Sequence, residues 1–376
     1  MSPSTFEESI GVVIDLGSKF TKAGFATESS PRTIFPTAVG RFRHQALLDG
    51  IPQFFFGNEA IQKQGISKLN WPVESGIIKD WDEIEKLWHH TFFQELLVPP
   101  ENTRVLHTVH PQIPRGDRER MAETMFESFA INYLYVVKIP VLVLHASGRT
   151  TGVVYENGAE CAYVAPIYEG FPLKHAIEVS TLTGEKLTDI LTKSLSAIGY
   201  SFTTPVERQI VNDMKAKLCY VPLQYDEEMN LRGNNQVKYD LPDGQQVIIG
   251  NERFKCPEVF FQPSLHDFNC PNVVENICKS IERSETEYQK LFYENIVISG
   301  GTTMLKGLAD RLLGELSRRP KLQANTKVGI DEMPYPQNLA WTGGSIVASL
   351  QSSKGFWISK QEYDDIGGDV VNYKFF

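Results

Sequence analysis

Residues 11–20 read GVVIDLGSKF, and residues 152–161 read GVVYENGAEC. Each stretch begins with Gly and two valines, followed by a large residue, an acidic residue, one further residue and a second Gly. A run of β-branched residues that ends at a glycine predicts a strand closed by a tight turn. The sequence therefore predicts the same strand-and-turn unit twice, with the two copies 141 positions apart.

The length and composition restrict the class of protein. A chain of 376 residues exceeds one ordinary hydrophobic core, so two lobes are expected. The net charge of −9 disfavours a nucleic-acid-binding surface, which needs clustered Lys and Arg. No apolar run approaches the length of about 18 residues needed to span a membrane, so no membrane insertion is expected. Five cysteines without CxxC spacing predict reduced thiols and no zinc site.

Strand and helix patterns alternate on both sides of the repeated unit. Helices are expected at residues 81–97, 117–131, from Thr183–Leu187 onward, and at 205–221. A buried strand, a turn at Gly300–Gly301 and a helix are expected within residues 294–316. Two strands are expected across residues 141–158, and a glycine pair that opens a helix across 340–350. This alternation is typical of duplicated α/β lobes.

Two smaller features have a structural and a functional interpretation. His89 and His90 are adjacent on an expected helix, where neighbouring side chains point about 100° apart, so packing is favoured over a shared metal. Residues Phe54–Phe56 follow a Gly- and Pro-containing stretch. They fit an exposed interaction loop and packing beneath a small subdomain equally well.

The chemistry of the repeated turns points to phosphate. A tight turn of small residues presents backbone N–H groups to an anion, and two such turns facing each other could hold a di- or triphosphate. Asp15 and Glu156 would then hold Mg²⁺ through water. The glycine pair Gly300–Gly301, after a third strand, is suited to contact with a base and ribose.

A series of short motifs resembles the actin and actin-related protein family, in the family's order and over nearly the whole chain. They include KAGF at 22–25, FPTAVGR at 35–41, MFESF at 125–129, ASGRTTGVV at 146–154, SGGTTM at 299–304 and WISKQEYDD at 357–365. The resemblance implies an α/β actin fold, with two ribonuclease-H-like lobes and a central cleft for ATP or ADP with Mg²⁺. It divides the chain into residues 1–145 plus 340–376, with a subdomain at about 37–73, and residues 146–339, with a subdomain at about 186–275.

The same resemblance assigns a nucleotide site and a partner cleft. The nucleotide-binding residues would be Gly17, Ser18, Lys19, Lys22, Gly158, Gly184, Lys215, Gly300, Gly301, Thr302 and Met304, with Asp15 and Glu156 holding the metal through water. The partner cleft would be formed by His145, Gly148, Thr150, Gly170, Thr342, Ile346, Val347, Leu350 and Phe356. Such a cleft receives amphipathic helices of partners.

The sequence departs from the family pattern within the implied nucleotide pocket. Lys19 replaces a glycine of the first turn, and the second turn reads Glu156-Asn157-Gly158-Ala159-Glu160 with one carboxylate fewer. The lysine could contact phosphates, or pair with Glu156 or Glu160. The family's two water-orienting residues are matched by Ile139 and Tyr163, and three nucleoside contacts by Ala216, Leu305 and Gln337. These changes predict that ATP hydrolysis is very slow or lost, since Ile139 cannot hydrogen-bond water.

Surface segments differ from the family as well. The loop Arg43–Phe56 carries an apolar tip, and the segment Leu265–Asn272, matching the family's hydrophobic plug, is more polar. Glu285 and Glu287 preserve the acidic residues of the family's longitudinal contact. We therefore expect a structural subunit that binds protein partners through the cleft and this loop, in the cytoplasm or cytoskeleton, with the nucleus as the other compartment. The alternative is a conventional ATP-binding, self-polymerising actin. A sugar kinase or chaperone ATPase of the wider superfamily is disfavoured.

Overall fold

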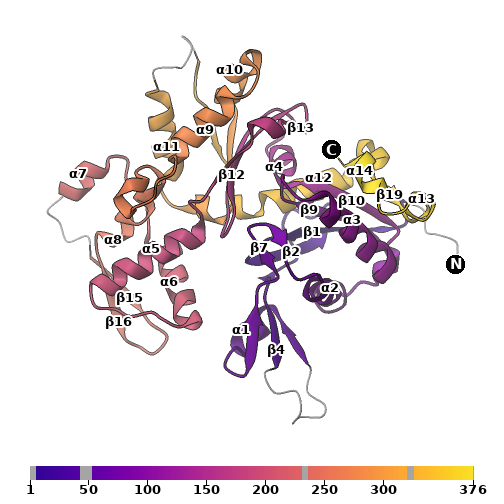
Figure 1. Cartoon of the computed structure of the whole chain (residues 1–376), viewed down its shortest axis with the longest axis horizontal. Helices are drawn as coiled ribbons and strands as arrows, with labels where there is room; N and C mark the ends of the chain where they lie inside the picture. The colour runs from indigo at the N-terminus through magenta and orange to yellow at the C-terminus, as the bar shows by residue number, and fades with distance from the viewer. Residues whose placement is uncertain (1–5, 43–52, 231–235, 320–325, 376) are drawn as a thin grey trace. The chain divides into compact units, whose positions relative to one another are not determined.

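The computed structural model describes residues 6–42, 53–230, 236–319 and 326–375. The chain forms two compact units. The first unit comprises Met1–Thr150 and Asn338–Phe376, so both ends of the chain belong to it, and the second comprises Thr151–Gln337. In Figure 1 the first unit carries the indigo-to-purple and yellow segments, and the second the magenta-to-orange segments.

The first unit is built on a six-stranded sheet of order β19-β10-β9-β1-β2-β3. Its strands are β1 Ile10–Leu16, β2 Phe20–Phe25, β3 Thr33–Pro36, β9 Thr103–Val109, β10 Tyr133–Lys138 and β19 Ile358–Ser359. β1 and β2 form the predicted antiparallel hairpin, whose turn is closed by the Gly17 N–H donating to the Phe20 carbonyl at 3.1 Å. β1, β9 and β10 run parallel, and their central residues are buried.

The second unit repeats this plan on a sheet of order β13-β12-β11-β17-β18, with β14 paired to β12. Its strands are β11 Gly152–Asn157, β12 Ala162–Tyr168, β13 Phe171–Pro172, β14 Glu178–Ser180, β17 Ile296–Ser299 and β18 Ile330–Glu332. β11 and β12 form the second hairpin, and β11 pairs in parallel with β17 as β1 does with β9. The repeated strand-and-turn is therefore confirmed in both units.

Each unit also contains helices (Figure 1). In the first unit they are α2 Trp81–His90, α3 Arg115–Glu123, α4 Ile139–Ala146, α12 Leu339–Ser349, α13 Lys360–Ile366 and α14 Val370–Lys374. In the second they are α5 Gly184–Ala197, α6 Pro205–Leu218, α7 Tyr225–Asn230, α8 Glu252–Lys255, α9 Val273–Glu282, α10 Thr286–Glu294 and α11 Leu308–Ser317. The helices expected from the patterns at 81, 117, 183 and 205 are confirmed. α2 and α3 each continue into a π-helical turn, Thr91–Glu95 and Thr124–Ser128.

Smaller elements complete each unit. The first unit has a three-stranded sheet of β4 Val39–Phe42, β5 Phe54–Phe56 and β6 Ser67–Asn70 beside α1 Gly57–Gln62, and a pair of β7 Val73–Glu74 and β8 Ile77–Ile78. The second has the hairpin of β15 Val237–Asp240 and β16 Gln246–Ile249. No helix in the described ranges is long and apolar enough to cross a membrane.

The prediction of a strand at the start of residues 141–158 is wrong. The stretch from Ile139 to Ala146 forms helix α4, with Pro140 in its first turn. Leu142, Val143 and Leu144 are all buried. A short run that is apolar on every side has no period that separates a helix from a strand, and burial in the core overrides the β propensity of valine.

The glycine pair at 343–344 does not open a helix, because both glycines lie inside α12. A Cβ on Gly343 would stand 1.8 Å from the Leu142 carbonyl oxygen of α4. A Cβ on Gly344 would stand 2.8 Å from a methyl group of Val13 on β1. The pair therefore lets α12 approach both α4 and the sheet closely, which is the reason for glycine here despite its cost within a helix.

Residues Phe54–Phe56 form a strand and not the tip of an exposed loop. Phe55 is buried against Ala38 and Ala60, and the Phe56 ring stacks on His90 with centroids 5.1 Å apart. His90 Nε2 also donates a hydrogen bond to Glu95 Oε1 at 3.1 Å, so its role is in packing. The packing interpretation of the phenylalanines holds, and the rest of the proposed interaction loop, residues 43–52, lies outside the described residues.

Replacing Gly343 with alanine should destabilise the first unit by about 1–3 kcal/mol, because the added methyl group overlaps the Leu142 carbonyl. The measurement is the free energy of unfolding in urea. Gly314→Ala in α11 is the matched control, since a Cβ there meets no atom within 4 Å. It should leave stability unchanged or raise it by up to about 1 kcal/mol. Equal effects of the two substitutions would contradict the close approach of α12 and α4.

Candidate functional site

The first half of the candidate site lies at the end of β1. Asp15 is 3% exposed and directly opposite Lys22 in the β1–β2 register. The Lys22 ammonium donates to Asp15 Oδ2 at 2.7 Å, and Thr108 Oγ1 of β9 donates to Asp15 Oδ1 at 2.6 Å. The carboxylate predicted to serve the metal is thus held from two sides by strands that the sheet places next to β1.

The turn after Asp15 is fixed by neighbours from outside the hairpin. Thr37 Oγ1 donates to the Gly17 carbonyl at 2.8 Å, and the Gly76 N–H donates to Ser18 Oγ at 3.2 Å. A Cβ on Gly17 would stand 2.9 Å from the Phe20 carbonyl oxygen, so glycine is required by the turn itself. Gly17 and Ser18 therefore lie beside Asp15 and Lys22 at this end of the hairpin.

Lys19 has a contact that the sequence did not indicate. Its ammonium stands 4.3 Å from the centre of the Trp71 ring, within the same unit. A cation over an indole face is attracted by about 0.5–1 kcal/mol at exposed sites. The replacement of a glycine by lysine is thus accompanied by an aromatic surface on which the longer side chain rests.

Two buried histidines, which sequence analysis did not single out, lie on β9 and directly after it. His107 on β9 is 1% exposed, donates from Nδ1 to the Thr108 carbonyl at 2.8 Å and meets the Trp88 ring edge-on. Burial lowers the pKa of His107 to about 4, although the Asp15 carboxylate favours the charged form. Burial also lowers the pKa of His110 to about 4. The HTVH pattern at residues 107–110, at the end of an apolar run, was the available signal.

The second half of the candidate site brings three predicted residues together. The Gly158 N–H donates to the Cys161 carbonyl at 2.8 Å and closes the turn after β11. The Gly158 carbonyl accepts from the Gly184 N–H at 3.0 Å and from Thr302 Oγ1 at 2.9 Å. The turn is thereby joined to the first residue of α5 and to the 3₁₀ turn Gly301–Met304.

Lys215 and Gly300 complete the second half of the candidate site. Lys215 donates to the Gly184 carbonyl at 2.7 Å and to Thr188 Oγ1 at 2.9 Å, and burial lowers its pKa. Gly300 has a φ of 98°, and a Cβ there would stand 2.3 Å from the Asn157 carbonyl oxygen and 2.7 Å from Glu156 Oε1. The Glu156 carboxylate therefore lies against the Gly300 backbone. Met304 is 54% exposed.

Four positions at which the sequence departs from the family pattern are buried or carry a side chain without a hydrogen-bonding group. Tyr163 is 1% exposed and directly opposite Glu156 in the β11–β12 register. In the first unit, Ile139 is half-buried at the start of α4. Ala216 is exposed and Leu305 is buried. Their side chains, like that of Ile139, offer no hydrogen bond to a ribose or a water.

The residues present fit a phosphate ligand better than a protein-bound metal. Each half-site combines a glycine turn with a lysine, Lys22 in the first and Lys215 in the second, and both kinds of group are suited to phosphate. Among the described residues there is no group of three or more His, Cys, Asp or Glu side chains that could hold a metal. Each half-site has one carboxylate, Asp15 in the first unit and Glu156 in the second, of the type that contacts Mg²⁺ through its water shell when phosphates supply the inner ligands.

With these two half-sites described, comparison with known families gives one result. A model of the actin family matches residues 6–376. The chain belongs to the actin family. The α/β actin fold expected from the motifs is thus confirmed over nearly the whole chain. Proteins of this family generally bind ATP or ADP with Mg²⁺ and commonly interact with other proteins.

The residues assigned to the partner cleft fall in both units. Gly170 lies in the second, and the others lie in the first, at His145, Gly148, Thr150, Thr342, Ile346, Val347, Leu350 and Phe356. Ile346, Leu350 and Phe356 are 40–47% exposed. Val347 is 6% exposed and packs in the core with Leu142 and Trp341, so its assignment to the cleft surface is wrong.

The segment matching the hydrophobic plug is tied to the second unit. Leu265 lies in the 3₁₀ turn Pro263–His266 and is 48% exposed, while Phe268 and Cys270 pack against the core. Asn272, the last residue of the segment, caps α9 by accepting from the Glu275 N–H at 2.9 Å. All five cysteines have free thiols.

Acidification should destabilise the protein through His107. Because its pKa is about 4 in the folded state and about 6.5 when unfolded, the unfolded chain binds more protons between these values, and stability falls as the pH drops through this window. Between pH 7 and pH 5 the loss from this group is about 2 kcal/mol. His107→Gln should reduce the pH dependence of the unfolding free energy by that amount.

The control is His175→Gln, which changes an exposed histidine and should leave the pH dependence as in the original protein. Urea unfolding at pH 7 and pH 5 measures all three proteins. An unchanged pH dependence in His107→Gln would show that His107 is not held neutral in the folded state.

Proposed function

We propose that this actin-family protein acts mainly as a structural and interaction subunit of a cytoskeletal or larger multiprotein assembly, with weak or lost ATP hydrolysis. The observation that carries the proposal is the environment of Tyr163. Its side chain is buried within the sheet beside Glu156, at the position that matches a water-orienting histidine of the family. A packed phenol cannot take the place of an imidazole that positions an attacking water.

The second water-orienting position supports the same conclusion. Ile139 has neither a donor nor an acceptor in its side chain, so it cannot orient a nucleophile. General acid–base and positioning groups contribute about 10²–10⁴-fold to a rate. Loss at both positions leaves hydrolysis without the residues that the family uses for that step, while the backbone of the phosphate turns is present.

Nucleotide binding is a separate part of the proposal. Bound ATP or ADP would be held by Gly17, Ser18, Lys19, Lys22, Gly158, Gly184, Lys215, Gly300, Gly301, Thr302 and Met304, and its Mg²⁺ through water by Asp15 and Glu156. The cation would neutralise phosphate charge. Four contacts absent at Ala159, Ala216, Leu305 and Gln337 would weaken binding by about 4 kcal/mol, or roughly a thousandfold, at about 1 kcal/mol each.

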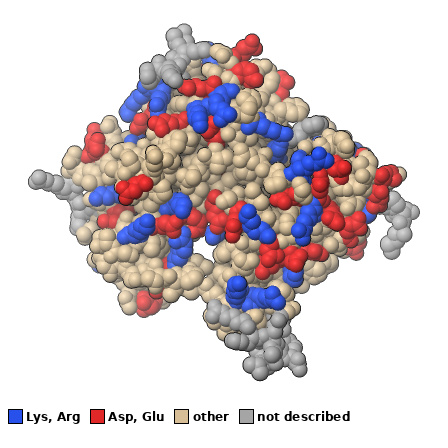
Figure 2. Space-filling model, in the orientation of Figure 1, with Lys and Arg blue, Asp and Glu red and all other residues tan. Residues whose placement is uncertain are grey.

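Protein partners are proposed at the cleft, with other actin-family subunits as candidates. Ile346, Leu350 and Phe356 supply exposed apolar side chains on one unit. The face shown in Figure 2 has basic and acidic side chains interspersed, without the single-sign surface that nucleic-acid binding uses. A cytoplasmic or cytoskeletal location, with the nucleus as the other compartment, is part of the same proposal.

The purified protein should release no phosphate from Mg-ATP above the protein-free rate under salt conditions that polymerise actin. A phosphate-release assay measures this, and chromatography of the nucleotide extracted from the purified protein shows whether ATP, ADP or neither is bound. Bound ATP that stays unhydrolysed would support both parts of the proposal. Phosphate release at the rate of a conventional actin would contradict it and favour the self-polymerising alternative.

The protein alone should not form long two-stranded filaments. The plug segment is polar, and its Phe268 and Asn272 are engaged in the core and in the cap of α9. Electron microscopy of the pure protein in polymerising salt is the measurement, with a conventional actin treated in parallel as the positive control. Abundant actin-like filaments from this chain would overturn the proposed role.

A further inference from the structure

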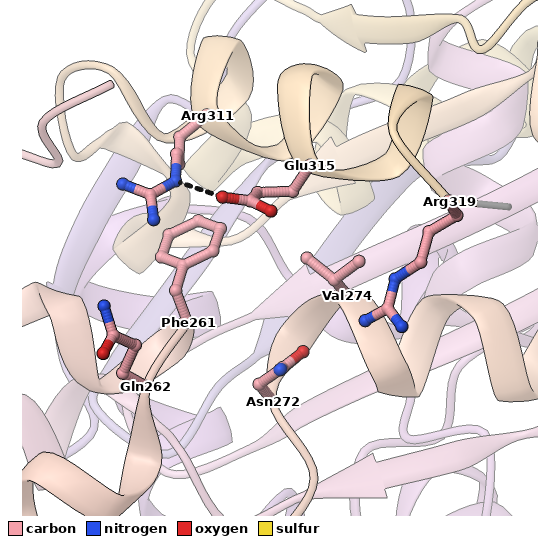
Figure 3. Close-up of a pocket in the computed structure, with 7 residues that line it drawn as sticks. All are labelled: Phe261, Gln262, Asn272, Val274, Arg311, Glu315 and Arg319. Atoms are coloured by element: carbon pink, nitrogen blue, oxygen red, sulfur yellow. Dashed lines mark hydrogen bonds and ion pairs between the residues drawn. The ribbon is translucent and has the colours of Figure 1, made fainter. Parts of the chain in front are cut away.

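A pocket of about 200 Å³ lies in the second unit and is formed by elements that do not carry the phosphate turns. It is lined by Phe261, Gln262, Asn272, Val274, Arg311, Glu315 and Arg319. In Figure 3, Arg311, Glu315 and Arg319 come from α11 and the residues after it, opposite the start of α9 and the segment at Phe261. Pockets for drug-sized ligands measure about 300–1,000 Å³, so this one suits a single side chain.

Arg311 forms a fixed wall of the pocket. Its guanidinium donates to the Pro222 carbonyl and to Glu315 Oε1, both at 2.9 Å, and pairs with buried Glu258 at 3.3 Å. It also lies over the Phe261 ring, 4.8 Å from the centroid. Arg311 and Glu315 therefore satisfy one another, and neither is available to a ligand without loss of these contacts.

Arg319 differs from Arg311 in this respect. It is half-buried, and no carboxylate or carbonyl of the described residues accepts from its guanidinium. Glu315, one helical turn before it, is already engaged by Arg311. A guanidinium presents two parallel N–H groups that match a carboxylate, and such charge-assisted pairs are among the stronger polar contacts.

Asn272 and Val274 complete the surroundings of this cation. Because Asn272 Oδ1 accepts from the Glu275 N–H, the orientation of the carboxamide is fixed and its NH₂ group is the end left for other contacts. Val274 is 3% exposed and adds an apolar wall beside Phe261. The pocket thus offers a cation and an amide donor next to apolar surface.

We propose that this pocket binds the carboxylate of an acidic side chain on a partner protein. The carboxylate pairs with Arg319 and accepts from Asn272, and the methylene groups of the side chain pack on Val274 and Phe261. A phosphate dianion fits less well, since the Glu315 carboxylate lines the same pocket and repels a doubly charged group about twice as strongly. The inference does not depend on whether nucleotide is bound or hydrolysed.

The test uses the full chain and the peptide acetyl-Glu-Glu-Glu-amide, with acetyl-Gln-Gln-Gln-amide as the uncharged probe, in calorimetric titrations at low ionic strength. The glutamate peptide should bind and the glutamine peptide should not. Arg319→Gln should weaken binding of the glutamate peptide about tenfold or more, the loss of one charge-assisted pair. Arg318→Gln, which removes the same charge from the exposed neighbouring residue, should change it by less than about twofold.

Three results would overturn the proposal. The first is the absence of glutamate-peptide binding to the original protein. The second is equal weakening by Arg318→Gln and Arg319→Gln, which would indicate attraction to net charge and not to this pocket. The third is displacement of the peptide by an equal concentration of inorganic phosphate, which would identify phosphate as the preferred oxyanion. Circular dichroism melting curves establish that both variants fold, so that a lost affinity reports on the pocket.

Discussion

The second unit depends on one carbonyl group, that of Gly158. It receives the first N–H of α5 and the hydroxyl of Thr302, and so joins the turn after β11 to a helix and to the turn after β17. This meeting of three segments requires that none of them carry bulk at the contact. A Cβ on Gly184 would stand 2.5 Å from Thr302 Oγ1. A Cβ on Gly300, whose φ is positive, would stand 2.3 Å from the Asn157 carbonyl oxygen.

It follows that three glycines of the half-sites are explained by the protein alone. Gly17, Gly184 and Gly300 would each place a Cβ within 3 Å of another protein atom, whether or not a phosphate is present. Their occurrence is therefore evidence for the fold and only weak evidence for a ligand. The side chains that would act on a ligand are more informative: Ile139 has no hydrogen-bonding group in its side chain, and Tyr163 is buried.

Sequence analysis found the parts of the fold that have a clear period or a repeated pattern. The hairpin at Asp15 and its copy at Glu156 were predicted, as were α2, α3, α5 and α6. α4 was missed, since Leu142, Val143 and Leu144 give no alternation of polar and apolar residues. The contacts of Lys19 with Trp71 and of Glu156 with Gly300 join residues distant in sequence, and no local pattern encodes them.

The close packing of α4 and α12 has a mechanical consequence. The chain leaves the first unit at Thr150, four residues after α4 ends, and returns at Asn338, immediately before α12 begins. Both covalent connections between the units are therefore attached to the same helix pair, which is held together at Gly343. A force that pulls the units apart through these connections therefore acts first on this helix pair. The contact between α4 and α12 resists that force at both connections.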